Sequence, residues 1–380
     1  MYLRDHAHAA LILERCFSQD SVSFMAIHSL EVQHFRNLKD IHIRPLPGLN
    51  YIIGPNGSGK SSLLEAIHCL GRGKSFRTHK TNRLICEGCS SFTVLGHVLQ
   101  HGRQFRVGMQ RERGKSTIKL AGRLIARSSE LTQALPVAVL EPGLHRLIEE
   151  GPEYRRKFLD WGVFHVEHDF HQIWRNYRRV LAQRNAALRI GGSKATIVNW
   201  DQELVQTADQ LTQARQHYLK NLMEYVTIDS QKFSDLAEVH ITYQQGWREG
   251  ESYADYLAAQ YSSDKERGFT QFGPHRADLR IRVQGVDARE YLSRGQQKVL
   301  VALLVLAQCE QMRMQDTSVV VLVDDLPSEL DTDKRRILMQ SLTETGAQIF
   351  LTGTDASLFP LDDTEYGMFH VEQGRIHVAG

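Results

Sequence analysis

The sequence has no apolar run long enough to cross a membrane. Its longest run, Val299 to Ala307, is far shorter than the ~20 residues that a membrane-spanning helix needs. A secretory signal is also absent, since Ala9 to Leu13 is too short for its apolar core and the acidic Asp5 and Glu14 stand in its flanks. We therefore expect a cytoplasmic protein with no membrane partner.

Cysteine is scarce, and neither sign of charge dominates. Five cysteines are scattered among 380 residues, and Cys86 and Cys89 form a lone C-x-x-C pair without a second pair of matching spacing. Reduced thiols are a better interpretation of this pair than a zinc site. The net charge of +2 demands no acidic partner, although such a balance can hide a local basic face.

A glycine-rich stretch follows the apolar run Leu49 to Ile53 and precedes a helix-like stretch, residues 63–67. The stretch fits the pattern G-x-x-x-x-G-K-[ST], and strand, loop and helix in this order are typical of a P-loop. Its glycines let backbone N–H groups curl around an anion at the positive end of the new helix. We predict a nucleoside triphosphate site made by Gly54, Pro55, Asn56, Gly57, Ser58, Gly59, Lys60, Ser61 and Ser62.

Two P-loop side chains have expected roles in phosphoryl chemistry. Lys60 reaches the β- and γ-phosphates, and the Ser61 hydroxyl binds Mg²⁺. The β-branched run Val319 to Val323 predicts a central strand beside the P-loop strand, and Asp324 at its tip is the second predicted Mg²⁺ ligand. Asp325 is placed to orient or deprotonate the attacking water. Most P-loop ATPases of this architecture have glutamate at this position. Because aspartate is one methylene shorter, we predict slow ATP hydrolysis.

A second phosphate-gripping element opens the predicted helix Gln297 to Met312. It has the form L-S-x-G-Q, with a serine, a glycine and an amide at a helix N-terminus: Ser293, Gly295 and Gln296. Two such elements in one chain are explained if each belongs to a different composite site. Ser293 and Gly295 of one subunit would then close over the γ-phosphate held by Lys60 of another, which predicts an ATP-dependent homodimer with Ser293 as a catalytic residue.

Glycine and proline become rare in the middle of the chain, where helical periodicity takes over. Asp169 to Ile190 and Trp200 to Val226 predict two long helices in a short antiparallel arm, with Arg215 as the one break in the second apolar pattern. An adjacent face of the first helix carries arginines, for which a solvated face and a nucleic-acid or partner surface both stay open: Arg175, Arg178, Arg179 and Arg189.

Taken together, the P-loop, the L-S-x-G-Q stretch, the strand ending in Asp324 and the loop 328–331 resemble the ABC ATPase superfamily. Further stretches resemble one branch of it, the RecF family: Phe35-Arg36-Asn37-Leu38, Lys74 to Thr78, Pro152 to Asp160, and Gly273-Pro274-His275-Arg276. The resemblance covers Met25 to Gly380. It implies an α/β fold, with an ABC-type P-loop ATPase head of mixed sheet and flanking helices and an inserted α-helical arm. It also implies that Arg36 and Asn37 join the nucleotide site.

We expect four segments on this basis. Residues 1–24 are an N-terminal extension, dispensable because Met25 reads as a new start; 25–148 form the N-terminal part of the head, 149–267 the helical arm, and 268–380 the C-terminal part of the head. Two departures from the family pattern stand out: Ala277-Asp278 replaces a pair of acids, and Glu141-Pro142-Gly143 replaces a Pro-Glu-Asp-like step.

What the RecF resemblance implies is a nucleoid-associated protein of the bacterial cytoplasm that uses ATP and Mg²⁺. It would dimerise on ATP, bind gapped duplex at junctions of single- and double-stranded DNA, and work with RecR and RecO to place RecA there in recombinational repair, with a link to the SOS response. The alternative is an ABC-type ATPase engine of another complex, either a transporter subunit or an SMC-like structural clamp. A metabolic P-loop kinase would have no use for Ser293 to Gln296.

Overall fold

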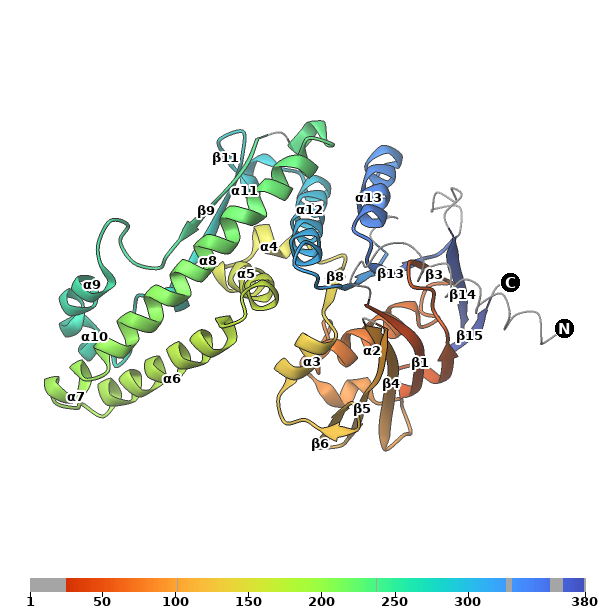
Figure 1. Cartoon of the computed structure of the whole chain (residues 1–380), viewed down its shortest axis with the longest axis horizontal. Coiled ribbons are helices and arrows are strands. Elements are labelled where there is room, and N and C mark those ends of the chain that lie inside the picture. The colour runs from red at the N-terminus through yellow and green to blue at the C-terminus, as the bar shows by residue number, and fades with distance from the viewer. Residues whose placement is uncertain (1–24, 101, 237, 326–329, 356–364, 379–380) are drawn as a thin grey trace.

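The computed structural model describes residues 25–100, 102–236, 238–325, 330–355 and 365–378. A part built on two sheets holds the P-loop, and a long helical arm extends from it to one side (Figure 1). The predictions made for residues 1–24 and for Ser328 and Glu329 lie outside the described residues. Within the described ranges, no helix combines the length and the apolar character that crossing a membrane requires.

The central sheet is mixed, in the order β15-β14-β3-β13-β12-β8. Five neighbouring strands run parallel, and a terminal hairpin closes one edge. The parallel strands β3, β12 and β13 are buried along their whole length, as is typical of parallel strands covered on both faces. The strands are β3 (Leu49–Ile53), β8 (Val137–Leu140), β12 (Val320–Val323), β13 (Gln348–Gly353), β14 (Tyr366–Glu372) and β15 (Arg375–Val378).

A second, antiparallel sheet has the order β2-β1-β4-β5-β6-β7. Helix α2 (Lys60–Arg72) lies between the two sheets, because its apolar side chains join one core with Ile27 of the second sheet and Leu322 of the central one. Packing here is close: a Cβ on Gly71 would come within 2.3 Å of Val137. The sheet contains β1 (Met25–Phe35), β2 (Leu38–Ile43), β4 (Ser91–Gln100), β5 (Arg103–Glu112), β6 (Lys115–Leu120) and β7 (Arg123–Leu124), and η1 (Thr81–Leu84) and α3 (Ser128–Ala134) lie beside it in the chain.

The helical arm is built on α6 (Phe170–Arg189) and α8 (Asp201–Ser230), which pack against each other and agree closely with the two predicted helices (Figure 1). Helix α8 also packs against α12 (Arg294–Arg313), which is buried on most of its faces. Shorter helices complete this part and the rest of the chain: α4 (Arg146–Glu149), α5 (Pro152–Val166), α7 (Lys194–Val198), η2 (Ser234–Leu236), α9 (Tyr253–Ala259), α10 (Tyr261–Arg267), η3 (Pro274–Arg276), α11 (Ala288–Tyr291) and α13 (Thr332–Glu344).

One strand interrupts the segment that we expected to be helical. β9 (Val239–Gln244) pairs antiparallel with β10 (Asp278–Val283), and β11 (Val286–Asp287) completes a three-stranded sheet. This sheet joins residues on both sides of the boundary predicted at 267/268. The mixed α/β head with an inserted helical arm is confirmed, with this strand as an addition.

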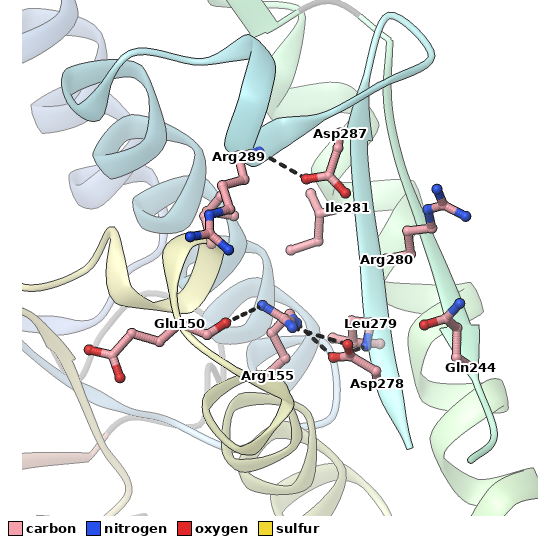
Figure 2. Close-up of a pocket in the computed structure, with 10 residues that line it drawn as sticks. Glu150, Arg155, Gln244, Asp278, Leu279, Arg280, Ile281, Asp287 and Arg289 are labelled. Carbon is pink, nitrogen blue, oxygen red and sulfur yellow. Dashed lines mark hydrogen bonds and ion pairs between the residues drawn. The ribbon is translucent and has the colours of Figure 1, made fainter. Parts of the chain in front are cut away.

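One of the stretches that distinguished the RecF family in the sequence, Pro152 to Asp160, supplies two ion-paired side chains, Arg155 and Asp160. Arg155 donates two hydrogen bonds to the carboxylate of Asp278, at 2.7 and 3.0 Å, and a third to the Glu150 carbonyl (Figure 2). Arg215, the break in the apolar pattern of α8, is buried and donates to both carboxylate oxygens of Asp160, at 2.8 and 3.0 Å. Ion pairs between distant segments therefore account for these charged residues.

Candidate nucleotide site

Steric requirements fix two of the P-loop glycines. The backbone of Gly54 has φ of 158°, and a Cβ there would approach the Val371 carbonyl oxygen to 2.2 Å. Gly59 has φ of 124°, and its Cβ would meet the Leu38 side chain at 2.7 Å. Both positions combine a left-handed backbone with no room for a side chain, so only glycine fits. The chain can then turn from β3 into α2 within a few residues.

Lys60 is buried under the loop that it terminates. Its ammonium group donates to the carbonyl oxygens of Gly54, at 2.8 Å, and Pro55, at 3.2 Å, and only 4% of the residue is exposed. The hydroxyl of Ser58 is buried nearby in the loop and has no hydrogen-bond partner among the described residues. A fixed positive charge and an unmatched buried hydroxyl in a glycine-rich loop suit an anionic ligand.

The two predicted Mg²⁺ ligands come together although 263 positions separate them. The Ser61 hydroxyl donates to Asp324 Oδ1 at 2.7 Å, and the Thr352 hydroxyl donates to the same oxygen at 3.0 Å. Burial raises the pKa of Asp324, and the hydrogen bonds from Ser61 and Thr352 oppose that rise. These are hard oxygen donors of the kind that Mg²⁺ prefers, so the residues present fit the ion.

One detail of the prediction is wrong. β12 does not lie beside the P-loop strand, because β13 separates β12 from β3. Ser61 and Asp324 still meet, since α2 crosses above the sheet and Ser61 stands in its first turn. The intervening strand contributes Thr352, a site residue that we did not single out from the sequence.

Asp325 and Glu141 extend the acidic edge of the site. Asp325 has a left-handed backbone, with φ of 50°, and its N–H donates to the Thr352 hydroxyl at 2.9 Å. Glu141 follows β8, whose Leu140 pairs with Val323 of β12, so Glu141 and Asp324 end neighbouring strands. Burial raises the pKa of Glu141, which is ion-paired with Arg146. The sequence showed Glu141 only as a departure from the family pattern.

Arg36 and Asn37 lie beside the P-loop in different roles. The Asn37 amide donates to the Gly57 carbonyl at 3.1 Å and accepts from the Ser62 hydroxyl at 2.8 Å, which braces the loop from outside. The Arg36 guanidinium forms a two-point contact with the fully buried Glu65 carboxylate. Ser75 also donates to Glu65, so this carboxylate links α2 to the basic loop 73–78.

The L-S-x-G-Q element forms an exposed helix start. Ser293 caps α12 and accepts from the Gln296 N–H, and the Gln296 side chain accepts in turn from the Ser293 N–H at 2.9 Å. A Cβ on Gly295 would meet nothing within 4 Å. These hydrogen bonds stay within the first turn of α12, so the element presents an open surface.

Comparison with known proteins identifies the family. The family model described as RecF/RecN/SMC N terminal domain matches residues 26–377. The DNA replication and repair protein RecF of Shewanella denitrificans is 42% identical over 358 residues, which are 93% of this chain and 99% of that protein. This chain belongs to the RecF family. RecF of Shewanella baltica matches with the same identity and coverage.

Solved structures agree with the RecF assignment. A structure described as the recombination mediator protein RecF-ATP in the RecFOR pathway has a TM-score of 0.83 at 27% identity, and the match covers 96% of this chain and all of that one. An Smc head domain from Pyrococcus furiosus has a TM-score of 0.58 at 15% identity, which shows a shared fold alone. The predicted RecF family and the predicted fold class are confirmed.

Proposed function

We propose that this RecF-family chain is an ATP-dependent DNA clamp of recombinational repair. The observation that carries the proposal is the 2.7 Å contact between Ser61 and Asp324, beside the buried ammonium group of Lys60. This contact supports a phosphate-binding loop next to an oxygen-rich cation site, the arrangement that a P-loop ATPase requires. The similarity to a RecF structure described with ATP supports the same nucleotide.

In this proposal the P-loop N–H groups and Lys60 hold the phosphates, and Ser61 and Asp324 hold Mg²⁺. When bound, the ion neutralises charge on the β- and γ-phosphates. Asp325, fixed by its N–H bond to Thr352, orients the attacking water. Its short side chain keeps hydrolysis slow. The role of hydrolysis in this proposal is to reset DNA binding, and not to supply ADP or phosphate to another reaction.

The open L-S-x-G-Q surface supports ATP-dependent dimerisation. Ser293, Gly295 and Gln296 of one copy would close over the γ-phosphate bound by Lys60 of the second copy. A dimer formed in this way could hold DNA between its arms and release it after hydrolysis. The clamp would act in the cytoplasm, at the nucleoid, on gapped duplex and junctions of single- and double-stranded DNA. RecO and RecR would be its partners in loading RecA.

The test is binding to a gapped duplex without nucleotide, with ADP and with a non-hydrolysable ATP analogue, while protein mass is followed in the same samples. We expect tight binding and a dimer only with the analogue. Lys60→Met should lose nucleotide binding. Ser293→Arg should keep nucleotide binding and lose the dimer, because the larger side chain blocks the partner's site.

A matched control is Ser193→Arg, which removes an exposed N-cap serine of the same kind from the arm. Both substitutions lose a cap bond that is typically worth ~1 kcal/mol. Only Ser293→Arg should change the mass of the complex. A dimer that ignores DNA in every nucleotide state would contradict the clamp and leave only the ATP-binding part of the proposal.

A further inference from the structure

A groove of about 690 Å³ lies where the head meets the arm, and we refer to it as the head–arm groove. One wall comes from the end of α2, the loop after it and the start of α3. The other comes from α5 and α6, which approach α3 at the base of the arm (Figure 1). Five cationic side chains line it: Arg72, Lys74, Arg127, Lys157 and Arg175.

The positive charge of this groove is not balanced. Asp160 is its one lining carboxylate, and both of its oxygens already accept hydrogen bonds from Arg215. Lys157 pairs with Glu153 at 2.6 Å on the exposed surface. The other four cations take part in none of the ion pairs found among the described residues: Arg72, Lys74, Arg127 and Arg175.

The smaller pocket of about 290 Å³ in Figure 2 shows the contrast. Its lining holds three carboxylates and three guanidinium groups, and Arg155 there is matched by Asp278. A pocket with balanced charges has little net attraction for a polyanion. The head–arm groove, with its surplus of cations, therefore attracts an anionic chain more strongly than this pocket does.

Titration of the groove residues reflects the same crowding of positive charge. The pKa of Lys74 is lowered by burial and then by the neighbouring charges of Arg72 and Lys157. The pKa of His171 is lowered by burial and then by Arg175 and Arg127. A bound anion would relieve this repulsion, since opposite charge favours the protonated forms.

Aromatic rings distinguish the ligand class. Two of the chain's four tryptophans, Trp161 and Trp174, line the groove together with Phe164, and all three are partly exposed. The guanidinium of Arg72 lies 5.7 Å from the Trp161 ring centroid, and that of Arg178 lies 4.9 Å from the Trp174 centroid. Cations interleaved with aromatic faces are the arrangement that binds single-stranded nucleic acid, because unpaired bases stack on the rings.

We propose that the head–arm groove binds a single-stranded segment of DNA, with phosphates on Lys74 and Arg175 and a base stacked on Trp174. The proposal deepens the clamp function and rests on it only in taking DNA as the polyanion. A duplex hides its base faces and gains little from the rings. An acidic peptide would contact the cations but has no bases to stack on the aromatic rings, so the observations favour nucleic acid. The groove thus supplies the single-stranded half of junction recognition.

The test uses the full chain with the ATP analogue, a fluorescent oligo-dT strand, and a duplex of equal length at two salt concentrations. Lys74→Glu and Arg175→Glu should each weaken single-strand binding by about tenfold and lower the log–log salt slope by about one. Trp174→Ala should weaken it at least about fivefold with the slope unchanged, because stacking releases no counterion. Duplex binding and the ATP-induced dimer should be unaffected.

Arg189→Glu is the matched control, since Arg189 is exposed on the same helix α6 and lies outside the groove lining. An equal loss in Arg189→Glu and Arg175→Glu would reduce the effect to overall charge and overturn the proposal. Equal losses in single-strand and duplex binding would also overturn the proposal. The same holds if Trp174→Ala binds the strand normally and polyglutamate displaces the strand, because the groove would then bind an acidic chain without base stacking. A wild-type chain that binds no DNA at all overturns the clamp as well, whereas groove variants that bind like wild type overturn the groove alone.

Discussion

The buried ion pair between Asp160 of α5 and Arg215 of α8 gives a quantitative test of what holds the arm together. Arg215 has 2% of its surface exposed, and besides its two bonds to Asp160 it donates to the Pro274 carbonyl at 2.8 Å. Burial lowers the pKa of Arg215, and Asp160 together with Tyr243 more than offsets that effect. A guanidinium keeps its proton even when such a partner is lost. Asp160→Asn therefore leaves a buried cation without compensation.

Breaking a buried pair typically destabilises a protein by ~3–5 kcal/mol, and we take the lower end because the Asp160 side chain is 23% exposed. We expect Asp160→Asn to lower the free energy of unfolding by about 3 kcal/mol. The assay is urea unfolding followed by far-UV circular dichroism. The combined change Asp160→Leu with Arg215→Met should recover much of the loss, because no buried charge is then left unpaired.

An exposed pair on the same arm serves as the control. Arg179 and Glu203 join α6 to α8 with side chains that are 54% and 40% exposed, so Glu203→Gln should change stability by less than about 1 kcal/mol. If Asp160→Asn destabilises the chain no more than Glu203→Gln does, the reasoning that the buried pair holds α5 against α8 is refuted.

Two further predictions concern the nucleotide site. Asp325→Glu restores the missing methylene and should raise the rate of ATP hydrolysis at unchanged ATP affinity, measured by phosphate release; a rate equal to wild type would show that side-chain length does not limit the reaction. Because burial raises the pKa of Asp324, the carboxylate takes up its proton at a higher pH than an ordinary aspartate, and Mg²⁺-dependent nucleotide affinity should fall early on acidification from about pH 8 to about pH 5. If the Asp324→Asn variant shows the same pH dependence of nucleotide affinity as the wild type, the assignment of this titration to Asp324 is contradicted.

Local patterns carried most of what could be predicted from the sequence. The P-loop, the acid-terminated strand and the long helices α6, α8 and α12 are each encoded within a few neighbouring residues, by glycine spacing or by apolar periodicity. These elements can therefore be predicted without knowing which segments of the chain meet in space.

Long-range pairing accounts for what was missed. The insertion of β13 between β3 and β12, and with it the place of Thr352, depends on the order of strands in a sheet, which no local pattern records. β9 has the alternating burial of a strand, yet its partner β10 lies beyond two helices in the chain. Arg184 is fully buried in α6 and paired with Asp201 and Asp264, contacts that helical periodicity cannot reveal.

Helix α2 has a mechanical consequence for the whole molecule. Its first residue, Lys60, ends the phosphate loop, and its last, Arg72, lines the head–arm groove. The helix has 13 residues, so the two ends are about 18 Å apart. Between them the helix is buried on nearly every face, and Gly71 leaves no slack against Val137. Such a rod transmits displacement rather than absorbing it. If nucleotide exchange shifts the P-loop, α2 would move as one rigid helix, and Arg72 at its C-terminal end would shift in the groove.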